Sequence, residues 1–207
     1  MRPGFVCVAG LDDSTSRHIR PVVAGQLPRR LAATEGGPFG IGEVIDLGEV
    51  SPRPHAPEVE DYLFEPGGMR PLATLSEREL WEAVSRVAVQ DPRGVIGADL
   101  VLRDQSLVVE PGKGSGSLVS WRPEGVTKIW IRQGSARFGV FVDGIFCDFA
   151  LNDLGLYEAD QQTARTDGVA RLAKGIAERP FVASAGLTRE FNGVHWLQVN
   201  NVHLAPR

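Results

Sequence analysis

Hydrophobic and polar positions alternate in short runs along this chain, and glycine or proline separates most of the runs. The 207 residues include 24 glycines and 14 prolines. Alternation with a period of two is typical of strands that bury one face, and Gly and Pro mark the turns between them. The runs that we predict as strands lie at 5–11, 17–23, 43–50, 94–102, 106–112, 117–121, 127–133, 136–144, 145–151, 181–191 and 194–204.

Turn signals join several of these runs into hairpins. The polar residues 12–16 separate the first two runs, Gly134-Ser135 separates 127–133 from 136–144, and Asn192-Gly193 separates the last two. Segment 51–71 is rich in proline and acidic residues, so we predict an ordered loop there with at most a short strand. The glycine-rich segment 112–117 is predicted to be a flexible turn.

Two stretches have the spacing of amphipathic helices. At 76–89, Ser76 and Glu79 form a capping-box signature before apolar residues at helical spacing. A second helix is predicted at about 161–178, where Val169, Leu172, Ala173 and Ile176 share one face. The fold class is therefore mainly β with two short helices. We predict an N-terminal domain over 1–110 and a C-terminal domain over 111–207, each with one of these helices.

Composition narrows the functional classes. The chain is 43% hydrophobic, which is ample for a core, and no run reaches the roughly 18 apolar residues of a membrane span. The N-terminus has no apolar run of signal-peptide length, so a cytoplasmic location without a membrane partner is expected. In that compartment Cys7 and Cys147 are expected to be buried and reduced, although a disulfide between them stays an alternative.

The net charge of −4 argues against a strong, indiscriminate binder of polyanions. The charge is unevenly distributed, however. Residues 1–30 hold five arginines against two aspartates, and 121–140 holds four basic residues against one glutamate. Residues 43–65 instead hold seven carboxylates against one arginine. Since local fields steer ligands more than the net charge does, nucleic acid remains a candidate partner.

The hairpin over 127–142 carries the most informative chemistry. Strand alternation puts Ile129 and Ile131 on the core face, together with alternate residues of the second strand. The opposite face then holds basic and aromatic residues: Lys128, Trp130, Arg132, Arg137 and Phe141. Single-stranded nucleic acid is held by such a surface, with bases on the rings and phosphates on the cations. The alternative is that the helix near 170 covers Trp130 and Phe141.

A second basic cluster comprises Arg17, His18 and Arg20, beside the polar turn at 12–16. On a strand, His18 and Arg20 project to the same side and could hold a phosphate or a carboxylate. The alternative is that this cluster forms salt bridges to the acidic stretch 43–65.

No catalytic, metal or cofactor motif is complete, so a non-catalytic protein without a cofactor is favoured. His55 lies near Glu58 and Asp61, but a metal site needs three or four converging ligands. The sequence has no GxSxG nucleophile motif. The glycine-rich segment 112–117 lacks the spacing of a phosphate-binding P-loop, and a strand-like run follows it.

Residues 7–22 carry a resemblance to a bacterial family, the dual OB-containing domain proteins. The matching elements are the Cys7, Ala9 and Gly10 positions and the run Ile19-Arg20-Pro21-Val22. Further similar segments are 43–50, the His55, Pro57 and Glu58 positions, and 179–204. The resemblance implies two small OB-like β-barrels side by side, and OB folds usually bind nucleic acid or oligosaccharide across a sheet face.

These observations lead to three functional hypotheses. The first is a binding protein for single-stranded DNA, single-stranded RNA or a nucleotide, with the 127–142 surface as its main site. The second is a protein-interaction subunit of a bacterial defence or nucleic-acid-processing system, which would show an exposed apolar patch. The third is an enzyme that acts on a nucleotide, with Arg17, His18, Arg20, His55 and Glu58 in one pocket.

Overall fold

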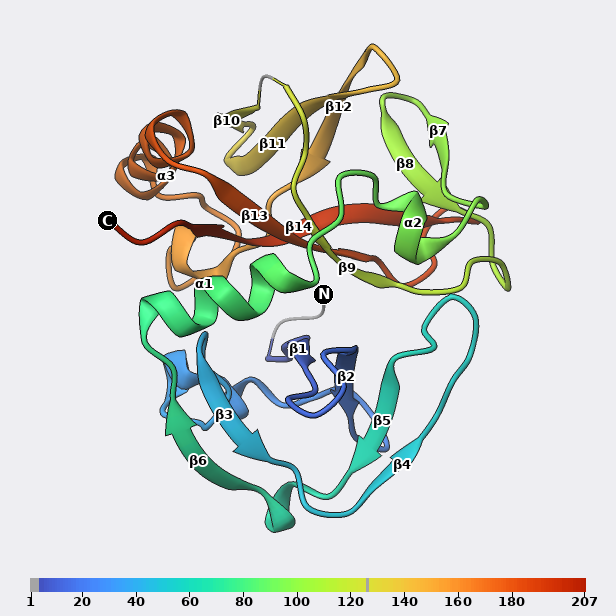
Figure 1. Ribbon diagram of the computed structural model, residues 1–207, viewed down its shortest axis with the longest axis vertical. Coiled ribbons are helices and arrows are strands. Elements are labelled where there is room, and N and C mark those ends of the chain that lie inside the picture. The colour runs from blue at the N-terminus through green and yellow to red at the C-terminus, as the bar shows by residue number, and fades with distance from the viewer. Residues whose placement is uncertain (1–3, 126) are drawn as a thin grey trace.

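The computed structural model describes residues 4–125 and 127–207, which form two lobes joined by a helix (Figure 1). The prediction of a mainly β fold is confirmed. The described strands form sheets of four, three, five and two strands, and each sheet is open. The two closed barrels that the family resemblance implies are therefore not confirmed.

The N-terminal lobe, residues 4–75, contains two sheets. Its four-stranded sheet has the order β1-β2-β5-β4, in which β2 and β5 run parallel and Arg20 pairs with Asp61. The bounds are β1 Gly10–Leu11, β2 His18–Val22, β4 Val50–Pro52 and β5 Asp61–Phe64; the second sheet pairs β3 Glu43–Asp46 with β6 Arg70–Thr74. Short 3-10 turns complete this lobe at Arg29–Leu31, Ala33–Glu35 and Pro66–Gly68.

The C-terminal lobe, residues 87–207, contains a five-stranded and a three-stranded sheet. The five-stranded sheet has the order β7-β8-β14-β13-β9, and the three-stranded sheet has the order β10-β11-β12. The bounds are β7 Val101–Arg103, β8 Ser106–Val109, β9 Leu118–Trp121, β10 Lys128–Arg132, β11 Ser135–Val142, β12 Ile145–Ala150, β13 Phe181–Leu187 and β14 His195–Leu204. The predicted domain boundary at residue 110 falls between β8 and β9, two strands of the same sheet.

Three α-helices occur in the described residues: α1 Glu77–Arg86, α2 Arg93–Ile96 and α3 Thr166–Glu178. The capping box predicted for α1 is confirmed, because Ser76 Oγ accepts from Glu79 N and the Glu79 carboxylate accepts from Ser76 N. Helix α3 begins later than predicted. Before it, the Asp160 carboxylate accepts from the backbone of Gln162 and Thr163 and closes a turn instead.

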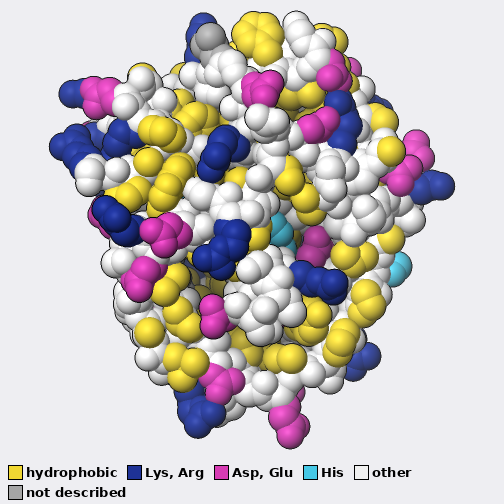
Figure 2. All heavy atoms as spheres, viewed as in Figure 1, with side chains coloured by type: hydrophobic (Ala, Val, Ile, Leu, Met, Phe, Trp, Pro, Cys, Tyr) yellow, Lys and Arg dark blue, Asp and Glu magenta, His cyan; other side chains and the backbone are white. Residues whose placement is uncertain are grey.

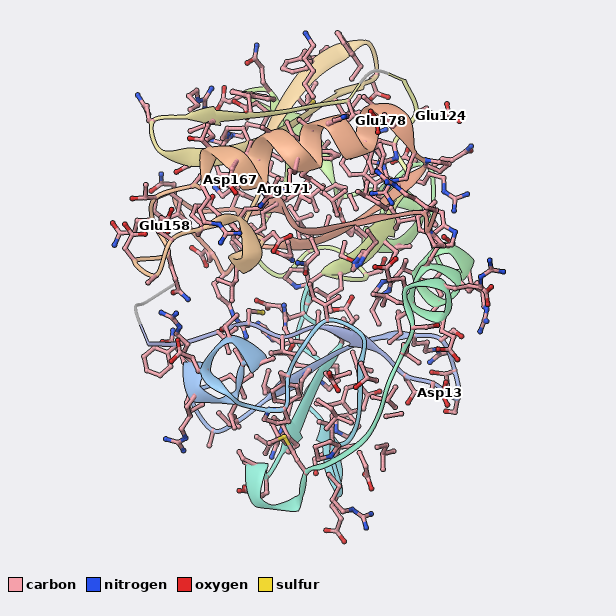
Figure 3. All side chains as sticks on the ribbon, turned by 90° about the vertical axis from the view of Figure 1, so that its left-hand side faces the viewer. Asp13, Glu124, Glu158, Asp167, Arg171 and Glu178 are labelled. Carbon is pink, nitrogen blue, oxygen red and sulfur yellow. The ribbon has the colours of Figure 1, made fainter. Side chains whose placement is uncertain are left out.

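Helix α3 lies on one side of the C-terminal lobe, where its charged residues point outward (Figure 3). Asp167 and Arg171 form an exposed ion pair one turn apart, with 2.6 Å between Oδ2 and Nη1. On its other face, Val169, Leu172 and Ile176 pack against the hydrophobic core. The predicted apolar face of this helix is thus confirmed. No helix of the described residues is long and apolar enough to cross a membrane.

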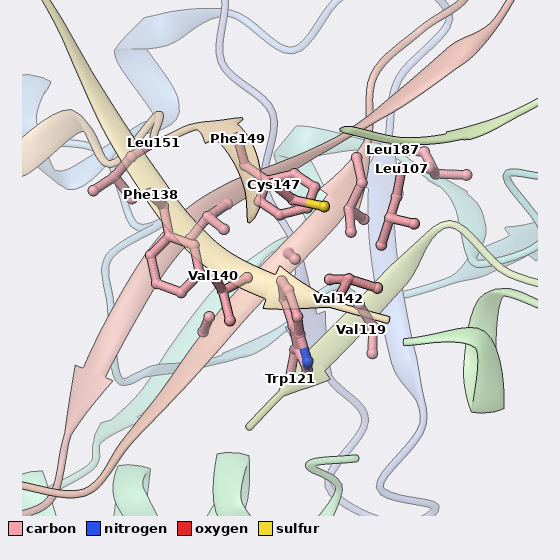
Figure 4. Close-up of a cluster of buried hydrophobic side chains, with 14 of the residues drawn as sticks. Leu107, Val119, Trp121, Phe138, Val140, Val142, Cys147, Phe149, Leu151 and Leu187 are labelled. Atoms are coloured by element: carbon pink, nitrogen blue, oxygen red, sulfur yellow. The ribbon is translucent and has the colours of Figure 1, made fainter. Parts of the chain in front are cut away.

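The main core lies between the sheets of the C-terminal lobe (Figure 4). Trp121 of β9 packs edge-on against Phe149 of β12, with ring centroids 5.7 Å apart, and lies 6.1 Å from Phe138 of β11. In the described part of the N-terminal lobe, the buried hydrophobic side chains are those of Leu27, Ala32 and Phe64. The N-terminal lobe is therefore the one with the smaller apolar core.

Several local predictions are corrected by the structure. The run 43–50 splits into β3 and β4, because Gly48 has a positive φ of 72° that no extended strand accommodates. The first part of 94–102 belongs to α2, and only its end is a strand. Segment 51–71 holds more strand than expected, since it contains all of β5 and the start of β6.

The glycine-rich segment 112–117 is anchored rather than free. Ser115 N donates to Ile96 O, and Ser117 is fully buried. The two cysteines are free thiols; Cys147 is buried as expected, whereas Cys7 is exposed. The run 5–11 becomes a strand only at its end, so Cys7 precedes β1 instead of lying within a strand.

Candidate functional site

The β10–β12 sheet shows the two-faced pattern expected from its sequence. Ile129, Ala136, Phe138 and Val140 are buried on the inner face. In the hairpin, Trp130 pairs with Arg137 and Lys128 pairs with Gly139. Lys128, Trp130, Arg132, Arg137 and Phe141 therefore share the outer face, as predicted. We call this surface, with Phe146 and Asp148 of β12 added, the β10–β12 outer face.

Three aromatic rings form a continuous row on this face. The Trp130 and Phe146 centroids are 6.0 Å apart with an interplanar angle of 31°, and Phe146 meets Phe141 edge-on at 5.4 Å. Phe141 is 50% exposed and Trp130 is partly buried. A Cβ on Gly139 would lie 2.6 Å from Trp130 Cζ3 and even closer to the Phe146 ring. The absence of a side chain at 139 therefore lets both rings lie over β11.

Sequence reasoning did not assign Phe146 to this surface, although the signal was present. In the run 145–151, Cys147 and Phe149 are buried and Phe146 alternates with them. Register then puts Phe146 opposite Phe141 in the antiparallel pair. Applying the alternation rule to the third strand as well as to the first two would have found it.

The cations of this face are partly neutralised by one carboxylate. Asp148 Oδ1 accepts from Arg137 Nε at 2.6 Å, and Asp148 Oδ2 lies 2.6 Å from Arg132 Nη1. Within the described residues Lys128 has no ion-pair partner. Three cations against Asp148 leave a formal charge of +2 on the face. The sequence of the 127–142 hairpin carries no signal for Asp148, because Asp148 lies on the next strand, β12.

The structure places the residues of the second predicted cluster, Arg17, His18 and Arg20, in different environments. Arg20 is only 4% exposed, and its Nε lies 2.5 Å from Asp61 Oδ1. The salt-bridge interpretation is thus confirmed for Arg20. In contrast, Arg17 is exposed and has no ion-pair partner in the part of the chain that the structure describes.

His18 lies where the two lobes meet. Its Nε2 is 3.1 Å from the Oγ of Ser120 on β9. Burial lowers the pKa of His18, and the nearby Glu60 carboxylate opposes that shift only in part. The imidazole is therefore held largely neutral at pH 7, which makes it a hydrogen-bonding group rather than a cation.

A network of ionic and polar contacts joins the lobes around these residues. Glu60 Oε1 accepts from Ser117 N at 2.7 Å and from Leu118 N at 3.1 Å, and Glu60 Oε2 accepts from Ser117 Oγ at 2.7 Å. Arg189 of the C-terminal lobe donates to Glu58 Oε1 at 2.7 Å. Local sequence patterns contain no signal for these contacts, since their partners lie 57 to 131 positions apart.

The pocket required by the enzyme hypothesis is only partly assembled. Pairing of β2 with β5 does bring the first hairpin to the segment after His55. Glu58 is nevertheless bound by Arg189, and the His55 side chain is exposed. In the described ranges 4–125 and 127–207, no group of three or more His, Cys, Asp or Glu side chains could hold a metal ion.

Comparison with known proteins adds no assignment. No protein-family model, curated protein or solved structure matches this chain.

Proposed function

We propose that this protein binds single-stranded nucleic acid on the β10–β12 outer face. The observation that carries the proposal is the row of aromatic rings formed by Trp130, Phe146 and Phe141. This row is open to solvent at Phe141 and lies beside Lys128, a cation that has no ion-pair partner among the described residues. Stacking of a base on an aromatic ring contributes about 1–3 kcal/mol and tolerates any base.

The arrangement of charge supports a modest affinity with a measurable dependence on salt. Asp148 holds Arg132 and Arg137 in place but cancels one positive charge. With about two phosphates neutralised, log K should fall against log salt with a slope of about −1.4 for a single strand. A strong polyanion binder would show a much steeper slope.

The relation to dual OB-containing domain proteins is part of the same proposal. It is supported by the hairpin of residues 7–22, which forms β1 and β2 with Gly10 opposite Ile19. OB folds use one sheet face for binding oligonucleotides, and the β10–β12 outer face would serve that role here. Two OB-like units would each correspond to one lobe.

Fluorescence anisotropy with labelled single-stranded DNA, single-stranded RNA and duplex DNA at two salt concentrations tests this proposal. We expect the single strands to bind more tightly than the duplex. Phe141→Ala should weaken single-strand binding by roughly fivefold to a hundredfold, because one stacking contact is lost.

Phe191→Ala is the matched control, because Phe191 is also exposed, at 64%, but lies in the turn between β13 and β14. It should leave the affinity unchanged. Equal losses in the two variants, or no binding of any probe at low salt, would contradict the proposal. The absence of nucleic-acid binding would favour the protein-interaction hypothesis. Partner pull-downs would then be the next experiment.

A further inference from the structure

A cavity lies at the junction of the two lobes, and none of the residues that line it belongs to the β10–β12 outer face. Its volume is about 380 Å³, within the range of roughly 300–1,000 Å³ that small-ligand sites occupy. Four segments from both lobes converge on it: the turn before β2, the segment 59–62, the end of α1, and α2. The lining residues are Ser16, Arg17, His18, Val59, Glu60, Tyr62, Val87 and Val95.

Four of the eight residues that line this junction cavity are hydrophobic. Val59, Val87 and Val95 supply aliphatic surface, and Tyr62 supplies one aromatic ring. Such walls favour a ligand with a flat, weakly hydrated ring, because burying it against apolar surface removes that surface from water. Figure 2 shows one face of the molecule, where a histidine side chain lies near the middle with acidic and basic side chains around it.

The polar groups of the cavity have unused capacity for hydrogen bonds. His18 uses Nε2 for Ser120, and Nδ1 has no partner among the described residues. Glu60 Oε2 accepts a single hydrogen bond in the described structure, from Ser117 Oγ, so one lone pair remains for a donor. The neutral imidazole of His18 and the carboxylate of Glu60 can together form hydrogen bonds to a ligand ring whose edge carries both an acceptor and a donor.

Arg17 adds a cation to this cavity. It is exposed, and the described residues offer it no ion-pair partner, so its guanidinium is free to bind an anion. A guanidinium presents a planar fork of donors that matches phosphate or carboxylate. The cavity thus combines a ring-sized apolar space, a hydrogen-bonding edge and one anion-binding group.

We propose that the junction cavity binds a nucleoside monophosphate, with the base between Tyr62 and the valines and the phosphate on Arg17. His18 and Glu60 would bond the edge of the base. The proposal does not depend on the β10–β12 outer face, because the two sites share no residue.

Isothermal titration with AMP, CMP, GMP and UMP tests this site, with adenosine and inorganic phosphate as separate arms. At least one monophosphate should bind at millimolar concentration or below, more tightly than adenosine or phosphate alone. Arg17→Ala should weaken that monophosphate roughly tenfold or more and leave adenosine unchanged, because a charged hydrogen bond is lost. Arg103→Ala, which removes an arginine exposed on β7, is the matched control and should have no effect.

A second variant tests the cavity without removing a polar group. Val59 is 37% exposed at the cavity, so Val59→Trp should fill the space while the fold is retained, and monophosphate binding should be lost. Failure of all four monophosphates to bind overturns the inference, as does binding that neither Arg17→Ala nor Val59→Trp weakens. Phe141→Ala should not change monophosphate binding, which separates failure of this site from failure of the oligonucleotide surface.

Discussion

At the scale of single residues, the most informative side chain is Arg20. A buried arginine is tolerated only when a carboxylate compensates its charge. Asp61 supplies that charge, and Arg189 approaches the other oxygen of Asp61 at 3.6 Å. Arg20 Nη2 is buried and has no hydrogen-bond partner in the described structure. Arg20 therefore depends on Asp61 for most of its compensation.

Asp61→Ala should lower the free energy of unfolding by about 3–5 kcal/mol, because it leaves the Arg20 guanidinium buried and uncompensated. Chemical denaturation monitored by tryptophan fluorescence measures this change. Arg70→Ala is the control, since it removes an ion pair to Asp46 whose arginine is 75% exposed. That variant should cost less than about 1 kcal/mol. Similar losses of unfolding free energy in the two variants would show that the buried Arg20–Asp61 pair stabilises the protein no more than the exposed pair does.

At the scale of elements, Gly139 of β11 determines how the aromatic row is built. Glycine usually weakens a strand, so replacement by alanine would ordinarily be neutral or favourable. Here a Cβ would collide with the rings of Trp130 and Phe146, so both rings would have to shift outward from β11 and lose part of their packing.

Gly139→Ala should therefore destabilise the protein by about 1–3 kcal/mol through overpacking. It should also weaken oligonucleotide binding, because the rings are displaced. Gly94→Ala is the control, since Gly94 lies in α2 with open space around its Cβ position. That change should be neutral or stabilise the protein by up to about 1 kcal/mol. Unchanged stability and binding in Gly139→Ala would show that the rings are not held as described.

At the scale of the whole molecule, Glu60 joins the lobes by accepting three hydrogen bonds from Ser117 and Leu118. These bonds are buried and have a charged acceptor, so each contributes about 1.5–3 kcal/mol. Within its described residues, the N-terminal lobe has few buried hydrophobic side chains of its own. Its stability should consequently depend on contact with the C-terminal lobe.

Glu60→Ala should split a single cooperative unfolding transition into two, with the N-terminal lobe melting first. Differential scanning calorimetry measures the number of transitions. Glu65→Ala is the control, because Glu65 is exposed on the same lobe and should leave one transition. One unchanged transition in Glu60→Ala would mean that the lobes do not depend on this contact.

Elements with a strong local signal were predictable from the sequence. The hairpin of β10 and β11 followed from strict alternation around Gly134, and the start of α1 followed from the spacing of Ser76 and Glu79. Such patterns depend on contacts between residues a few positions apart, or on which face of a strand is buried. Both leave a regular spacing of apolar and polar residues along the sequence. The outer-face positions of Trp130 and Phe141 were predictable for the same reason.

Tertiary structure alone decided which carboxylate binds which arginine and where the lobes meet. Asp61 was one of seven acidic residues in 43–65, and local pattern does not select it as the partner of Arg20. The parallel pairing of β2 with β5, the contact of Glu60 with Ser117, and the open edges of the sheets likewise depend on segments far apart in sequence. Periodicity gives each strand its buried face, but long-range packing decides which faces, charges and cavities come together.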